Sequence, residues 1–123
     1  MRWAVFLAGL SGAVGVGMGA AAAHGLSSRL DPDALEWVRT GAEYQLWHST
    51  ILAGIGLFGA RRKAFRLSAV LLALGILVFS GSLYVMAFTG MRWLGAVTPI
   101  GGLALITGWI VLAWAGWRYT GQR

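Results

Sequence analysis

The sequence predicts an all-α membrane protein: four transmembrane helices in an antiparallel bundle, with a short interfacial helix in the first external loop. Four apolar stretches are each about long enough to cross a bilayer as a helix. The chain is 58% hydrophobic and 11% charged, which leaves too few polar side chains to cover a soluble core. Short loops, particularly Gly90-Met91-Arg92 between the last two stretches, favour antiparallel neighbours.

All 123 residues are expected to form one domain, residues 1–123, with helices at about 3–24, 43–60, 65–89 and 93–117. The start of the chain resembles a signal peptide, but its apolar run of about 21 residues is longer than the usual apolar core of such a peptide. We therefore interpret it as the first membrane helix. In that helix Ser11, Gly15, Gly19 and Ala23 recur every four residues, which predicts a small-residue face for close packing.

A separate short helix is expected on the outer surface at about residues 32–40. Asp31-Pro32-Asp33 is a strong helix start, because a capping acid precedes Pro at the first helical position and a second acid follows it. Leu35, Trp37 and Val38 give the segment an apolar side. The segment is predicted either to continue into the second membrane helix through Thr40-Gly41 or to bend there.

The fourth stretch contains Pro99, which removes a backbone hydrogen bond from a helix interior. Gly101-Gly102 follows just beneath it. We expect the fourth helix to be kinked at this level.

Basic residues set the expected orientation. With four crossings, one side carries seven of them (Arg2, Arg61, Arg62, Lys63, Arg66, Arg118 and Arg123) and the other side carries Arg29, Arg39 and Arg92. Both termini are therefore predicted to be cytoplasmic in a multi-pass protein of the cell inner membrane. Because the basic residues flank the helices and form no single patch, the net charge of +6 does not indicate nucleic-acid binding.

Polar residues within the stretches gather towards one leaflet. Depths counted along the helices are about 6 Å for His48, about 10 and 13 Å for Ser82 and Ser80, and about 8 Å for Thr98. The shared depth predicts an outward-facing polar pocket. The candidate ligand-binding residues are His24, Glu43, Tyr44, Gln45, His48, Ser80, Ser82, Tyr84 and Thr98.

Each candidate also has a structural interpretation. Ser and Thr in membrane helices usually bond to a carbonyl or a neighbouring helix, Tyr84 fits an interfacial anchor, and His24 fits simple solvation near the headgroups. His48 lies deeper, where ionisable groups tend to face the bundle interior. His24 and His48, with Glu43, are candidates for a metal or haem, although no paired-ligand motif supports them and no cofactor is assigned. Cysteine is absent, which excludes disulfides and thiolate sites.

Four motif blocks resemble the YgdD/YwdK-like family of small bacterial inner-membrane proteins, which is related to a small eukaryotic transmembrane protein. The blocks are Ala23-His24-Gly25-Leu26, Tyr44-Gln45-Leu46-Trp47-His48, Phe79-Ser80-Gly81-Ser82-Leu83-Tyr84 and Leu94-Gly95-Ala96-Val97-Thr98-Pro99-Ile100-Gly101-Gly102. The resemblance covers almost the whole chain. It implies four helices and an inner-membrane location, and it implies no activity.

These observations predict an integral inner-membrane protein of unknown function that acts as a binding or accessory protein for a lipid, a small molecule or a partner helix. The alternatives are a subunit of an oligomeric transporter or channel, and a His-based metal or haem site. An enzyme built from Ser80 or Ser82 with His48 and Glu43 is disfavoured, since no catalytic motif supports it and no catalytic residue is assigned. The expected partners are membrane lipid and a homo-oligomer or a larger membrane complex.

Overall fold

The computed structural model describes residues 1–59 and 62–120, and the described part is helical, with no strand. The four long helices are α1 (Arg2–Ala23), α2 (Pro32–Phe58), α3 (Lys63–Thr89) and α4 (Thr98–Thr120). Two short 3-10 helices, η1 (Leu26–Ser28) and η2 (Arg92–Ala96), lie in the loops at one end of the molecule.

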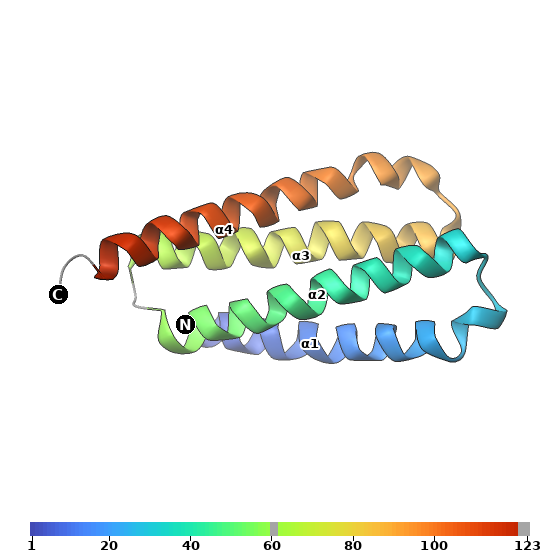
Figure 1. Cartoon of the computed structure of the whole chain (residues 1–123), viewed down its shortest axis with the longest axis horizontal. Helices are drawn as coiled ribbons and strands as arrows, with labels where there is room; N and C mark the ends of the chain where they lie inside the picture. The colour runs from blue at the N-terminus through green and yellow to red at the C-terminus, as the bar shows by residue number, and fades with distance from the viewer. Residues whose placement is uncertain (60–61, 121–123) are drawn as a thin grey trace.

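The long helices lie side by side in chain order (Figure 1). α1 packs on α2, α2 on α3 and α3 on α4, while α1 meets α3 only briefly. α1 begins and α4 ends at the same end of the molecule. The two inner helices, α2 and α3, therefore have different neighbours on their two sides.

The predicted surface segment 32–40 is part of α2 and does not form a helix of its own. Asp31 caps the helix as predicted, because its Oδ1 accepts a hydrogen bond from the Ala34 amide at 2.8 Å, and Pro32 takes the first helical position. The helix then runs unbroken through Gly41. Glycine costs a helix interior only about 1 kcal/mol, and here the bare backbone of Gly41 gives space to the Tyr84 ring.

α3 and α4 are joined by a tight turn at Gly90, whose φ of 72° lies in the left-handed region that glycine adopts without strain. The fourth predicted helix, 93–117, is divided at Val97: η2 comes first and α4 begins at Thr98. Pro99 therefore lies in the first turn of α4, where its missing N–H removes no helical bond. The expected kink within a continuous helix is wrong for this reason.

Glycine allows the close helix crossings. The face predicted in α1 lies against α2, where a Cβ added at Gly15 would lie 3.0 Å from Leu46. A Cβ at Gly101 of α4 would collide with the backbone nitrogen of Phe79 in α3. These contacts bring helix backbones together without large side chains between them, as small residues do in membrane helices.

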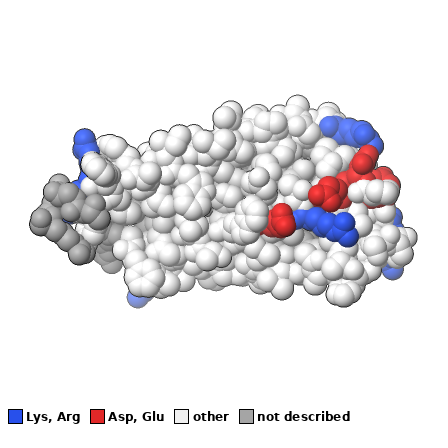
Figure 2. Space-filling view, viewed as in Figure 1, with Lys and Arg blue, Asp and Glu red and all other residues white. Residues whose placement is uncertain are grey.

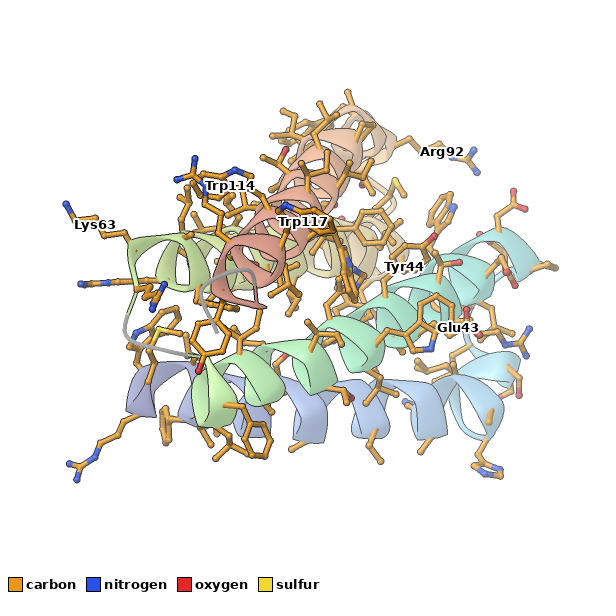
Figure 3. All side chains as sticks on the ribbon, turned by 60° about the vertical axis from the view of Figure 1, so that its left-hand side comes forward. Glu43, Tyr44, Lys63, Arg92, Trp114 and Trp117 are labelled. Carbon is orange, nitrogen blue, oxygen red and sulfur yellow. The ribbon has the colours of Figure 1, made fainter. Side chains whose placement is uncertain are left out.

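Within the described residues, three segments are long and apolar enough to cross a membrane: Arg2–Ala23, Lys63–Thr89 and Arg92–Tyr119. Figure 2 shows acidic and basic residues gathered at the end that holds the α1–α2 and α3–α4 loops, while the middle of the face shown carries none. In Figure 3, Lys63 and Arg92 mark opposite ends of the molecule. This distribution of charge is the one expected of a protein with its middle in hydrocarbon.

Candidate functional site

A hydrogen-bonded network joins α1, α2 and α3 around the side chain of Gln45. The amide nitrogen of Gln45 donates to the carbonyl oxygen of Ser11 at 3.0 Å and to its hydroxyl at 3.2 Å. The Ser49 hydroxyl donates to the Ser11 hydroxyl at 2.7 Å, and the Tyr84 hydroxyl donates to the Gln45 amide oxygen at 2.5 Å. Gln45 is thus bonded through both its nitrogen and its oxygen.

A second contact between α2 and α3 lies beside this network. The Ser80 hydroxyl donates to the carbonyl oxygen of Gly41 at 2.7 Å, and Ser80 is buried. The Tyr84 ring covers the same glycine. Ser80 therefore acts in helix packing, which is the structural interpretation that the sequence favoured for the serines.

Between α1 and α3 a groove of about 460 Å³ opens over α2. Leu7 and Leu10 line it from α1, and Leu77 lines it from α3. Polar groups reach it at four positions, and all four belong to the contacts described above: Ser11, Gln45, Ser80 and Tyr84. The groove is thus lined mostly by apolar side chains, and its polar residues are the four around Gln45.

Ser82 and Thr98 form a separate pair between α3 and α4, with their hydroxyl oxygens 2.6 Å apart. One of the two hydroxyls donates to the other, and the accepting one can donate to a carbonyl oxygen of its own helical region, that of Phe79 for Ser82 or of Leu94 for Thr98. The structure thus brings these two of the nine candidates together. They do not share a cavity with Gln45 or Tyr84.

His48 and Tyr44 lie on the side of α2 that faces α4. His48 Nδ1 lies 2.6 Å from the carbonyl oxygen of Tyr44, and its ring stands 5.9 Å from the Tyr44 ring and 6.2 Å from the Trp109 ring. The Tyr44 ring in turn lies 4.7 Å from that of Phe79. In Figure 3, Tyr44 is on the α4 side of α2 and Glu43 on the other side.

The depth predicted for His48 stays a prediction, but its reference point is not the end of the helix. It was counted from Tyr44 as the outer end of the helix, but α2 begins at Pro32. His48 contacts Trp109, the middle residue of α4. It therefore lies near the middle of the long helices, further from their loop end than Ser80, Ser82 and Thr98.

His24 and His48 do not converge. His24 is exposed at the end of α1, and its neighbour Ala22 packs against Val38 in the first turns of α2. Val38 and His48 are separated by about 15 Å along α2. Glu43 is also exposed, and the described residues include no group of three His, Asp or Glu side chains that could hold a metal.

Sequence reasoning missed three residues that take part in these contacts. Ser11 was assigned only to a packing face, although a serine among glycines on that face is a candidate hydrogen-bond partner for the facing helix, and here it accepts from Gln45 and Ser49. Ser68 donates to the carbonyl oxygen of Gly108 at 2.8 Å, about 8 Å from the Lys63 end of α3, whereas the sequence indicated polar groups towards the other end. Trp109 gave no signal, because a Trp within an apolar stretch is unremarkable.

Four long helices, three of them long and apolar enough to span, define a helical membrane protein. The profile of DUF423, described as a protein of unknown function, matches residues 18–102. The chain belongs to this family, which confirms the resemblance stated from its motifs.

Its relatives are described as membrane proteins. The chain is 44% identical over 113 residues to a UPF0382 membrane protein of Haemophilus influenzae, covering 91% of each chain. It is 38% identical to the UPF0382 inner membrane protein YgdD of Escherichia coli, over 90% of this chain and 86% of the relative. A UPF0382 membrane protein of Staphylococcus haemolyticus is 38% identical over 98% of this chain and 100% of the relative. No solved structure matches.

Proposed function

We propose that the protein is a non-catalytic membrane protein that binds one lipid molecule in the groove between α1 and α3. The observation that carries the proposal is a groove of about 460 Å³ whose walls are apolar and whose polar atoms gather at one end. Pockets that are mostly apolar, with a few placed polar groups, are the usual form of small-molecule sites.

The direction of the groove fits an amphipathic molecule. Along α3 it extends from Ala73 to Tyr84, about 16 Å. Tyr84 lies about 8 Å from the loop end of α3 at Thr89, whereas Ala73 and Leu7 lie deeper. A lipid would therefore place its polar part near Tyr84 and Gln45 and its acyl chain against the leucines.

The topology that goes with this proposal has four crossings. α2 is packed between α1 and α3, two of the three apolar helices, so it lies alongside segments that span. Its first turns, residues 32–40, then extend to the outer interface, and both termini lie in the cytoplasm with the larger number of basic residues. Because the chain has no cysteine, single cysteines at Asp33 and Lys63 can report the two sides in intact cells. Labelling of the Lys63 position alone from outside would overturn this orientation.

Photo-crosslinking tests lipid binding. The probe is a phospholipid with a photoreactive acyl chain, in vesicles of phosphatidylethanolamine and phosphatidylglycerol that hold the purified protein. Adducts are expected to concentrate on Leu7, Leu10 and Leu77, with few on Leu103, which is exposed to a similar extent on α4. Adducts spread evenly over all exposed apolar positions would mean ordinary surrounding lipid and would overturn the proposal.

A matched pair of variants sharpens the result. Leu77→Trp should fill the groove and remove most of its adducts, whereas Leu103→Trp adds the same bulk to an exposed position on α4 and should leave them unchanged. The two leucines are 69% and 64% exposed, so neither change disturbs a buried core position. Equal adduct yields from the two variants would contradict binding in the groove.

The other functions stay predictions from the sequence. The Ser–His–Glu assembly considered for an enzyme is not formed, because Ser80, Ser82 and His48 each bond elsewhere and Glu43 is exposed. The oligomeric transporter and the accessory subunit have no observation that favours them over lipid binding.

A further inference from the structure

We propose that His48, Tyr44 and Trp109 form a second binding site, for a lipid-soluble molecule that carries a phenolic hydroxyl. The site faces α4 and is formed by α2 and α4. Gln45 and the groove lie on the side of α2 that faces α1. The two sites can therefore be tested separately, and this one does not depend on the lipid proposal.

One nitrogen of the His48 ring has a fixed role. Nδ1 lies 2.6 Å from the carbonyl oxygen of Tyr44, and a carbonyl oxygen can only accept. Nδ1 therefore carries the proton and donates it. In a neutral imidazole the other nitrogen, Nε2, is then a hydrogen-bond acceptor.

That acceptor has no partner within the described part of the chain. His48 is 6% exposed, and within the described residues its side-chain hydrogen bond is the one made by Nδ1. Among the described residues no buried side-chain nitrogen or oxygen lacks a partner, so Nε2 must reach the molecular surface. At mid-depth that surface faces hydrocarbon, where an unpaired polar atom is costly. A hydroxyl donor from the lipid phase would remove this cost.

The surroundings of Nε2 favour an aromatic donor. The Tyr44 ring is stacked on the imidazole at an interplanar angle of 16°, and the Trp109 ring meets it edge-on at 71°. Tyr44 and Trp109 are 37% and 43% exposed, so both offer ring surface to an incoming molecule. Aromatic rings prefer stacked or edge-to-face neighbours. Depth adds a second constraint, because Trp109 lies about 16 Å from either end of α4 and a ligand there must be otherwise apolar.

The test uses two probes that differ in whether the phenolic oxygen carries a proton or a methyl group. Para-octylphenol can donate a hydrogen bond, and para-octylanisole, its methyl ether, cannot. The full chain is reconstituted in lipid nanodiscs with its histidines carrying a nitrogen label for magnetic resonance. The chain has two histidines, so His24 is an internal control. The phenol should shift the Nε2 resonance of His48 in a saturable way, while the ether moves neither histidine.

Two variants check the contacts. Trp109→Leu should weaken phenol binding about three- to tenfold, the worth of one aromatic contact. Trp93→Leu removes another exposed tryptophan, in η2, and should leave binding unchanged. The titration of the unaltered chain does not depend on either variant folding.

Three results would overturn the proposal. The phenol and the ether could act equally, or both histidines could shift together, which would show nonspecific partition into the nanodisc. A shift of His48 without any phenol, dependent on the number of chains in each nanodisc, would show that a second copy supplies the donor.

Discussion

Buried polar side chains are hydrogen-bonded differently on the two sides of α2. On the side that faces α1, Gln45 and Ser49 belong to a network in which donors and acceptors are matched across three helices. On the side that faces α4, the His48 side chain bonds within its own helix, as far as the chain is described, and lies between the Tyr44 and Trp109 rings. One side uses polar groups to join helices, and the other holds a polar atom ready for a partner from outside.

The difference follows from the neighbours of each side. Small residues in α1 let its backbone approach α2, so the short side chain of Ser11 can reach Gln45. α4 is held beside α3, and it reaches His48 only through the long Trp109 side chain. We therefore expect substitutions on the first side to reduce stability and substitutions at His48 to affect binding.

The largest effect is expected at the crossing that positions α4. In Gly101→Ala the new Cβ collides with the backbone of Phe79, which cannot rotate away. Overpacking of this kind costs typically about 1–3 kcal/mol, and this change should lie at the upper end. Unfolding in mixed detergent and SDS, followed by circular dichroism, measures the loss.

Gly102→Ala is the matched control, because its Cβ would lie 3.8 Å from the Phe79 ring, an ordinary contact. The control should remain close to the unaltered protein in stability. If both variants unfold at the same SDS fraction, α3 and α4 do not cross as closely as described. The position of Trp109 beside His48 would then no longer be supported.

Gln45→Leu should come next, because it breaks the network at its centre. The Tyr84 hydroxyl loses its acceptor, and Ser11 loses its bonds to Gln45 while keeping the one to Ser49. A polar group left without its partner costs about 1–2 kcal/mol. Ser49→Ala, which removes one bond at the edge of the network, should cost less in the same SDS titration. A larger loss for Ser49→Ala would contradict the central role of Gln45.

Much of the helical arrangement could be predicted from the sequence. Long apolar stretches and an Asp-Pro helix start act locally, so the helices and the Asp31 cap follow from them. The limits of α2 and α4 did not follow, because they depend on tertiary contacts. Gly41 continues the helix while the Tyr84 ring covers it, and Pro99 starts a helix after a 3-10 turn.

The candidate site could be predicted in composition and less well in arrangement. Residue types alone indicated Gln45, Ser82, Tyr84 and Thr98 as polar groups in apolar surroundings. Which of them meet depends on the rotation of each helix about its axis, and this is decided by packing. The depth of His48 was counted from Tyr44 for a related reason, because the sequence did not show that the helix begins at Pro32.

Ser80→Ala tests a single isolated bond between α2 and α3. Its hydroxyl donates to the carbonyl oxygen of Gly41, and that oxygen keeps its own place in the α2 helix. Side-chain hydrogen bonds between membrane helices average about 0.6 kcal/mol, so a loss of that size is expected in the same titration. A loss as large as that of Gln45→Leu would mean that Ser80 belongs to the network.

The smallest effect on stability is expected at His48. Phenylalanine keeps a ring beside Tyr44 and Trp109, and the Tyr44 carbonyl keeps its ordinary helical bond to the amide of residue 48. His48→Phe should therefore cost less than about 0.6 kcal/mol, the average for a bond between membrane helices. It should nevertheless abolish the preference for the phenol over its ether. His48 and Gln45 are equally buried, so a much smaller loss of stability for His48→Phe than for Gln45→Leu would show that His48 contributes little to holding the helices together. An equal loss of stability would show that Nε2 already has a partner in the folded protein.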